Sequence, residues 1–211
     1  MIISFMNQKG GAGKTTLSTN VARYFHMKGE SVLFVDADPQ GSARDWHAAG
    51  ETPVINMIAL DRPTLPKDIK EFSDKYDWIF IDSPGEIKEM AAAVLKCSDI
   101  ALIPVQPSPY DIWATADTIE LIKTRQDITD GKLKAAFIIS RQIHNTTVSK
   151  EVKEALDAHQ LPIFQNRTSQ RVSYVTSAAM GRTVLDNVPN TDAAAVNEIQ
   201  SIAEELREFV K

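Results

Sequence analysis

The chain has 211 residues, a formal net charge of −5 and a hydrophobic fraction of 43%, as expected for a globular rather than a disordered protein. The negative charge excludes a polycationic chain, so any nucleic-acid binding needs a local basic patch. The one cysteine, Cys97, excludes an internal disulfide framework and suits a reducing cytosol. We find no signal peptide at Met1 and no apolar stretch long enough to span a bilayer, so we expect a cytoplasmic protein.

Short apolar runs alternate with segments of helical length along the chain. The predicted strands are IISF (2–5), SVLFVD (31–36), a weak run at 54–58, WIFID (78–82), IALIPV (100–105) and AAFIIS (135–140). The predicted helices are residues 15–28, 86–97, 111–126 and 149–159, and Gly29 is a good cap for the first. Runs this apolar suit strands buried on both faces of a sheet. We therefore predict an α/β fold, a doubly wound, mostly parallel sheet with helices on both faces, as one domain over residues 1–211.

The segment NQKGGAGKTT (7–16) joins the first predicted strand to the first predicted helix. Glycines in such a loop let backbone N–H groups converge on phosphate oxygens, and the helix amino terminus adds partial positive charge. Lys14 is expected to reach the β- and γ-phosphates, and the Thr15 hydroxyl to ligate Mg²⁺. The alternative is a glycine-rich turn with a chance GKT, which the strand-to-helix position disfavours. The predicted nucleotide-binding residues are Gly10, Gly11, Ala12, Gly13, Lys14, Thr15 and Thr16.

This loop departs from the general pattern G-x-x-x-x-G-K-[ST], because Gln8 replaces the first glycine and a second lysine, Lys9, follows it. The pattern K-G-G-x-G-K-[ST] resembles the deviant Walker A motif of the ParA/MinD family of P-loop ATPases. The resemblance implies that Lys9 reaches the nucleotide of a partner subunit, whereas Lys14 contacts the nucleotide of its own. A cation from a second subunit can stabilise the charge that develops in phosphoryl transfer. Two lysines thus imply a dimer with ATP between its subunits.

Aspartates end two of the predicted strands, in VDADPQG (35–41) and IFIDSPG (79–85). The resemblance makes Asp38 the residue that orients the attacking water and Asp82 the Walker B carboxylate that holds Mg²⁺ through water. Asp36, two residues before Asp38 on the same strand face, is expected to lie near the metal. Each aspartate alone could be a helix cap or turn residue. The order of the motifs favours a nucleotide site, since ligands collect at the carboxyl ends of strands in open α/β sheets.

Further motifs extend the resemblance over most of residues 1–185. Ser83, Pro84 and Gly85 are expected to form a switch loop that senses the γ-phosphate. The segment IPVQPSPYD (103–111) resembles the proline-rich segment of the family. Arg141, in SRQ (140–142), is expected where the family contacts the adenine, or else it is a surface residue.

The last segment of the chain, residues 193–211, predicts an amphipathic helix. Its predicted apolar stripe consists of Val196, Ile199, Ile202, Ala203 and Leu206, with Phe209 or Val210. Its polar face carries Glu198, Glu204, Glu205 and Glu208 against Arg207 and Lys211. MinD-like members bind membrane through a C-terminal helix, but anionic lipid would repel an acidic face. We therefore predict that this helix packs on the domain and that the protein has no membrane partner.

A basic stretch at residues 164–182 has no acidic residue. ParA-type partition proteins bind DNA without sequence preference through basic residues in this region. The DNA-binding residues carried over from that resemblance are Arg167, Arg171 and Arg182, with Lys150 and Lys153 as neighbours. Phosphate contacts need only positive charge, so binding should weaken steeply with salt. The alternative is a solvated helix face, and the net negative charge means that dimerisation would have to concentrate the patch.

These features together predict a slow ATPase that uses ATP and Mg²⁺ to partition plasmid or chromosomal DNA. Its ATP-bound dimer would coat nucleoid DNA, and a centromere-binding ParB-type partner would stimulate hydrolysis and release it. Because the predicted nucleotide domain begins at residue 2, we expect no N-terminal helix-turn-helix, as in the short ParF-type proteins. Two alternatives stay open: a MinD-like positioning ATPase on a membrane or polar scaffold, and a metabolic P-loop ligase or kinase similar to dethiobiotin synthetase. The acidic last helix disfavours the MinD-like positioning ATPase, and the motif VDADPQG disfavours the metabolic ligase or kinase.

Overall fold

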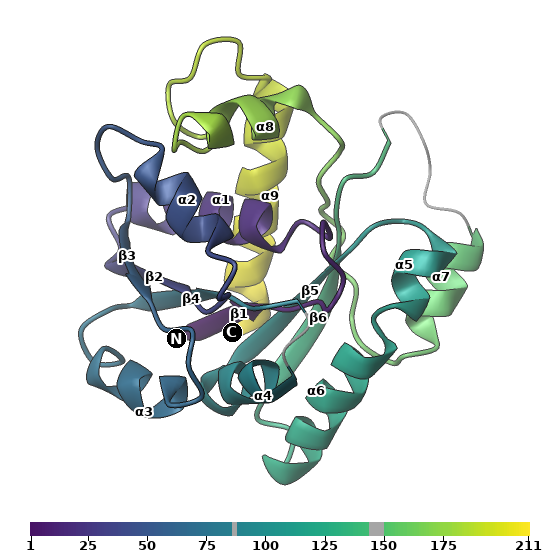
Figure 1. Cartoon of the computed structure of the whole chain (residues 1–211). Helices are drawn as coiled ribbons and strands as arrows, with labels where there is room; N and C mark the ends of the chain where they lie inside the picture. The colour runs from purple at the N-terminus through teal and green to yellow at the C-terminus, as the bar shows by residue number, and fades with distance from the viewer. Residues whose placement is uncertain (86–87, 144–149) are drawn as a thin grey trace.

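A computed structural model describes residues 1–85, 88–143 and 150–211, and it places the strands of these residues in one sheet (Figure 1). The strands are β1 (Ile2–Phe5), β2 (Val32–Asp36), β3 (Asn56–Ala59), β4 (Trp78–Asp82), β5 (Ile100–Val105) and β6 (Lys134–Ile139). Their order is β3-β2-β4-β1-β5-β6, and every neighbouring pair is parallel. The predicted fold class is confirmed. The weak strand predicted at 54–58 lies further along the chain in the structure, where β3 spans Asn56–Ala59.

Helices connect the strands and lie on both faces of the sheet (Figure 1). They are α1 (Lys14–Met27), α2 (Ser42–Ala48), α3 (Leu65–Asp68), the 3₁₀ turn η1 (Ile69–Glu71), α4 (Lys88–Cys97), α5 (Pro109–Trp113), α6 (Ala116–Ile128), α7 (Lys150–Asp157), α8 (Val172–Ala179) and α9 (Ala193–Val210). The first residues of the helices predicted at 86–97 and 149–159 lie outside the described residues. Gly29, at φ +85°, follows the end of α1 as predicted.

The prediction of one helix over residues 111–126 is wrong, because two helices, α5 and α6, occupy this region. The break lies at Ala114 and Thr115. The buried Thr115 hydroxyl donates a hydrogen bond of 2.6 Å to the Ile112 carbonyl, an interaction that competes with regular helical bonding. Pro109 occupies the first turn of α5 and requires no N–H partner there. As a result, Asp111 lies on a short helix of its own.

Alternating side chains of the strands supply two apolar clusters, one on each face of the sheet. Phe34 and Phe80 join the cluster that α1, α2, α8 and α9 cover. Leu33 and Ile79, their neighbours in the chain, join the cluster that α3, α4, α5, α6 and α7 cover. This burial on both faces explains why the strand sequences are almost continuously apolar.

The last helix, α9, packs on the domain as predicted. Its buried residues are Ala195, Ile199, Ile202, Ala203 and Leu206. Val196, which the sequence placed in the stripe, is only partly buried, because Ala195 takes the position that faces the core. Within the part of the chain that the structure describes, no helix combines the length and apolarity needed to cross a membrane.

Candidate nucleotide-binding site

The loop between β1 and α1 has the backbone of a phosphate cradle. Gly11 and Gly13 have φ of +75° and +94°, a left-handed conformation that favours glycine. A Cβ at Gly13 would lie 3.4 Å from the Cβ of Ser140, so the loop also approaches β6 closely. The amide N–H of Lys9 donates to the Asn7 side chain (2.8 Å), which fixes the entry to the loop. The local sequence therefore sets a loop shape that suits phosphate.

Four polar side chains from outside the glycine-rich segment or at its edge hold this loop in place. The Ser140 hydroxyl donates to the Ala12 carbonyl at 2.6 Å, and Asn7 Nδ2 donates to the Pro104 carbonyl at 2.7 Å. Gln106 Nε2 and Arg141 Nη1 both donate to the Gly11 carbonyl at 3.1 Å. Asn7, Gln106 and Ser140 were missed by sequence reasoning. Gln106 and Ser140 directly follow buried strands, and this position is the signal that could have found them.

Arg141, the predicted adenine contact, lies at the loop. Its backbone has φ +54°, and its side chain is exposed and bonded to Gly11. The structure therefore brings Arg141 to the rim of the predicted phosphate site. Its contact with adenine stays a prediction.

Lys14, Thr15 and Asp82 form the buried centre of the site. The Thr15 hydroxyl donates to Asp82 Oδ2 at 2.6 Å, and the Lys14 side chain lies in the loop with Nζ 3.5 Å from the Lys9 carbonyl. Burial raises the pKa of the Asp82 carboxyl to about 7, although the Thr15 hydrogen bond and the Lys14 charge oppose this shift. Burial also lowers the pKa of the Lys14 ammonium, which nearby Asp82 and Asp38 oppose. Buried charges are costly unless they are paired, and a phosphate and a cation would stabilise those of Lys14 and Asp82.

The donor set fits Mg²⁺ held jointly by protein and phosphate. The Oδ1 atom of Asp82 is buried and has no hydrogen-bond partner among the described residues. The other carboxylate oxygen, Oδ2, accepts a hydrogen bond from the Thr15 hydroxyl. Mg²⁺ prefers hard oxygen ligands and usually keeps waters and phosphate oxygens together with one or two carboxylates. Residues 1–85, 88–143 and 150–211 contain no cluster of three or more His, Cys, Asp or Glu able to hold a metal alone. Thr15 and Asp82 would hold the ion, whose charge would neutralise the phosphates.

Asp36 is the last residue of β2 and pairs with Asp82 in the parallel register, and Asp38 follows two residues later. Both oxygens of the buried Asp36 carboxylate accept hydrogen bonds: Oδ1 from the Asp38 N–H (3.0 Å), and Oδ2 from the Arg44 N–H and Nε (3.1 and 3.2 Å). Burial raises the pKa of Asp36 against these bonds. Asp36 therefore lies near the predicted metal position but organises the loop to α2. Asp38 is partly exposed, and its Oδ1 accepts a hydrogen bond from the Gln40 N–H (3.0 Å), so the carboxylate lies at the surface where it can face a ligand.

The predicted switch residues lie against the phosphate loop. Ser83 is buried, and its hydroxyl donates to the Phe5 carbonyl at 2.6 Å. A Cβ at Gly85 would lie 3.0 Å from the Gln8 carbonyl and 3.9 Å from Lys14 Nζ. Pro84 is buried between them. The geometry agrees with a segment that contacts the phosphate loop, and its switching stays a prediction.

Lys9 differs from Lys14 in its environment. Its Nζ lies 2.6 Å from Asp111 Oδ1, and its side chain is 36% exposed. Asp111, from α5, is mostly buried. One lysine thus lies inside the loop near Asp82, whereas the other lies at the surface and pairs with a neighbouring helix.

The predicted DNA-binding residues do not form one free basic patch. Arg171 pairs with Asp192 (2.5 Å) and Glu198 (2.8 Å), and its side chain is only 15% exposed. Arg182 donates to the Thr52 carbonyl at 2.7 Å. Residues 164–182 contain no acidic residue of their own, but α9 and its N-cap Asp192 bring carboxylates to them. Acidic side chains of α9 also accept from the backbone of this stretch, Glu198 from Ser169 and Glu205 from Gln165 and Asn166.

Three of the predicted DNA-binding residues remain exposed. Arg167 lies in the segment before α8, and Lys150 and Lys153 lie on α7. Lys150 makes an exposed ion pair of 3.4 Å with Glu154. In Figure 1, α7 and α8 occupy separate parts of the molecule. A DNA surface that joined Arg171, at the start of α8, to the lysines of α7 would therefore be spread out in one subunit.

The fold and the site together define a P-loop nucleotide-binding protein: a parallel sheet with the phosphate loop at the carboxyl ends of its central strands. A family model described as the CobQ/CobB/MinD/ParA nucleotide binding domain matches residues 3–195. The chain belongs to this family, as the resemblance to ParA/MinD ATPases predicted.

Similar proteins span nearly the whole chain. It is 29% identical over 210 residues to maintenance of carboxysome distribution protein A of Halothiobacillus neapolitanus, with 97% of this chain and 95% of that protein covered. It is 22% identical to the chromosome-partitioning ATPase Soj of Thermus thermophilus, with 97% and 94% covered. The septum site-determining protein MinD of Pyrococcus horikoshii, solved with Mg-ADP, shares the fold with a TM-score of 0.73 at 22% identity, over 99% and 96% of the chains.

Proposed function

We propose that this protein is a Mg²⁺-dependent ATPase whose ATP-bound form is a dimer, and that its nucleotide cycle distributes DNA cargo over nucleoid DNA. The observation that carries this proposal is the different placement of the two loop lysines. Lys14 lies buried near Asp82, where it suits the nucleotide of its own subunit. Lys9 lies at the surface of the same loop, where its ammonium can reach a second subunit once it leaves Asp111.

Chemically, the proposed site neutralises charge and positions a water. Lys14, Mg²⁺ and the loop N–H groups would bind the phosphates, and the Lys9 of a second copy would add a cation as charge develops on the transferred group. Asp38 is partly exposed two residues after β2, the strand that pairs with the Asp82 strand, and this position suits the orientation of an attacking water. A reaction that needs the second subunit would be slow until dimerisation and a partner complete it.

The proposed DNA step uses exposed cations that two subunits would supply together. Arg167 and Lys153 are exposed, and two copies in a dimer would double the number of such cations. The Thermus thermophilus relative is named as a chromosome-partitioning ATPase. We infer non-specific contacts with phosphate oxygens, and a ParB-type protein as the partner that releases the dimer.

The test measures anisotropy of a labelled DNA duplex of arbitrary sequence with ATP, with ADP and without nucleotide, at rising salt. We expect salt-sensitive binding only with ATP, loss of binding in Lys9→Ala, and weaker binding when Arg167 and Lys153 are changed to glutamate. Lys67→Ala and Lys70→Glu, which change exposed lysines on the α3–η1 side of the molecule, are the controls. Equal binding in every nucleotide state would contradict the DNA step, and ATP turnover measured in parallel would test the ATPase separately.

A second candidate shares the ATPase but moves a protein body instead of DNA. The Halothiobacillus neapolitanus relative, whose name refers to carboxysome distribution, favours it. Deleting the gene in its own host separates the cargoes, because loss of plasmid or chromosome inheritance indicates DNA cargo, whereas displaced protein bodies with normal inheritance indicate the second. Anionic lipid vesicles should bind neither nucleotide state, in contrast to a MinD-like positioning protein.

A further inference from the structure

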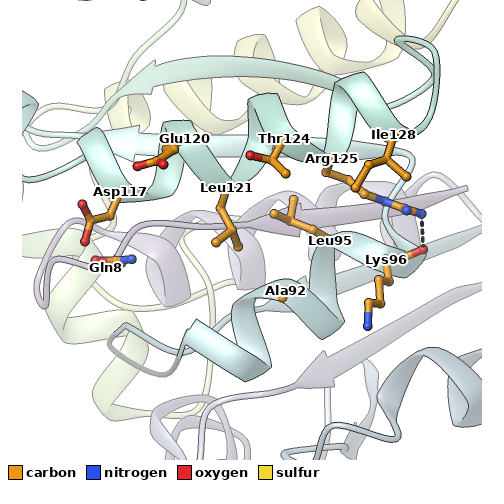
Figure 2. Close-up of a pocket in the computed structure, with 10 residues that line it drawn as sticks. All are labelled: Gln8, Ala92, Leu95, Lys96, Asp117, Glu120, Leu121, Thr124, Arg125 and Ile128. Carbon is orange, nitrogen blue, oxygen red and sulfur yellow. Dashed lines mark hydrogen bonds between the residues drawn. The ribbon is translucent and has the colours of Figure 1, made fainter.

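A groove with an apolar floor lies between α4 and α6, on the face of the sheet opposite α1 and α9 (Figure 2). Its cavity volume is about 350 Å³. Ala92 and Leu95 of α4 and Leu121 of α6 line it, and Ile128, which is 69% exposed, lies at one end. The nucleotide site described above uses none of these side chains.

The two ends of the groove have opposite charge. Asp117 and Glu120 lie at the end near Gln8, and Lys96 and Arg125 lie at the end near Ile128 (Figure 2). Arg125 donates to the Lys96 carbonyl at 3.1 Å, which joins the two helices. Its Nε is buried with no hydrogen-bond partner among the residues that the structure describes. Because this Nε is buried, the basic character of this end comes from the exposed Lys96 ammonium and from the positive charge of the partly exposed Arg125.

An α-helix has the charge distribution and the length that complement this groove. Its amino end carries partial positive charge and its carboxyl end partial negative charge, together with carbonyl groups that lack partners. The groove follows α6 from Asp117 to Ile128, a distance of ~16 Å or about three helical turns. Small ligands, in contrast, favour enclosed pockets with convergent polar groups, whereas here the polar groups lie apart at the two ends.

We propose that this groove docks an amphipathic helix of a partner protein, with the amino end of that helix beside Asp117 and Glu120 and its carboxyl end beside Lys96 and Arg125. Leucine-like side chains on one stripe would pack on the accessible Ala92, Leu121 and Ile128, with the buried Leu95 beneath them, as in other helix-in-groove complexes. This assignment concerns binding and does not depend on ATP hydrolysis.

The groove also contacts the phosphate loop. Gln8, which lines its acidic end, donates its N–H to Thr118 Oγ1 of α6 at 3.3 Å and directly precedes Lys9. A docked helix would therefore touch the loop that presents Lys9. We expect docking to change ATP turnover, and this consequence alone rests on the proposed function.

The experiment uses two labelled peptides of about 12 residues, long enough for three turns. Both carry leucines at positions i, i+3, i+4 and i+7. The test peptide has lysines at its amino end and glutamates at its carboxyl end, and the control peptide has these charges exchanged. The control peptide is the better isolated helix, because its charges complement its own dipole. A preference for the test peptide is therefore not explained by helicity.

Anisotropy titrations with the full-length protein give the outcome. We expect at least about tenfold tighter binding of the test peptide, loss of binding in Leu121→Glu, and exchanged preference in the double variant Glu120→Lys with Lys96→Glu. The double variant Lys70→Glu with Glu71→Lys makes the same charge exchange on the exposed surface of η1 and should keep the native preference. Thermal unfolding of each variant excludes loss of the fold.

Several outcomes would overturn the proposal. Equal binding of both peptides would indicate apolar adhesion without orientation. A second contrary outcome is that neither peptide binds but the small dye 8-anilinonaphthalene-1-sulfonate does. If Leu121→Glu abolishes that dye binding, the groove is a small-molecule site. ATP turnover is measured in parallel. Oriented peptide binding without any turnover would contradict the proposed ATPase but leave the docking site intact. Turnover without peptide binding would contradict the docking site but leave the proposed ATPase intact.

Discussion

The phosphate loop and the basic stretch at residues 164–182 both contain cationic side chains, but their environments differ. In the loop, Lys14 lies next to the carboxylate of Asp82, and the buried centre would gain from an anion and a metal ion. In the basic stretch, α9 supplies carboxylates, and Arg171 is already paired with two of them. A motif that fixes backbone shape can therefore indicate a site. A run of positively charged residues indicates a binding site only when it is known which of them already form ion pairs within the protein.

The largest expected effect comes from Lys14→Ala. Because truncating one member of a buried charge pair costs about 2–5 kcal/mol, nucleotide affinity should fall by roughly 30- to 4,000-fold. Titration with a fluorescent ATP analogue measures this change. Lys67→Ala, at an exposed position on α3, should bind like the native protein. Unchanged affinity in Lys14→Ala would show that the loop does not bind phosphate through this residue.

Replacement of Asp82 by asparagine tests the buried carboxyl through pH. Since burial raises its folded pKa to about 7, the folded state keeps a proton that the unfolded state loses near its ordinary value of about 4. The stability from this group is therefore full below pH ~4 and is lost as pH rises to about 7, on the order of 2–4 kcal/mol. Urea unfolding without nucleotide should show this decline in the native protein and not in Asp82→Asn. Parallel pH profiles would contradict the raised pKa.

Arg171→Ala should act on stability more than on DNA contact. The substitution removes the cationic partner of the half-buried Glu198, and we expect a loss of about 1–3 kcal/mol in the free energy of unfolding. Arg167→Ala, at an exposed position of the same stretch, should change stability by less than ~0.5 kcal/mol. Urea unfolding measures both. If Arg171→Ala keeps full stability but loses DNA binding, its ion pairs are not structural and the result supports the predicted contact of Arg171 with DNA.

The smallest effect is expected for Asp111→Asn, which removes the ion-pair partner of Lys9 without changing side-chain size. A partly exposed pair contributes at most about 1 kcal/mol, so release of Lys9 should tighten the ATP-dependent dimer by roughly three- to fivefold. Sedimentation with ATP, in an Asp38→Ala background chosen to slow hydrolysis, measures the dimer. Asp127→Asn, on the exposed face of α6, is the control. A weaker dimer would mean that Asp111 positions Lys9 instead of holding it back.

Much of the fold was predictable because its signals are local. Runs of apolar residues place most strands to within one residue, since a parallel strand buried on both faces needs few polar positions. The break at Thr115 was not predictable from the apolar pattern, because it depends on which backbone carbonyl one hydroxyl selects. The shift of β3 has a similar origin: this edge strand pairs only with β2, and its side chains are at most half buried.

The sequence by itself determined the phosphate loop, because glycine spacing and the strand-to-helix junction act through the backbone of adjacent residues. It also supplied Lys9, Lys14, Asp38 and Asp82 as candidates, since strand ends of a parallel sheet meet at one edge. Only the tertiary structure decided which charges are free. The pairing of Lys9 with Asp111, the pairing of Arg171 with α9, and the groove between α4 and α6 each join segments far apart in the chain, and their distances follow from packing.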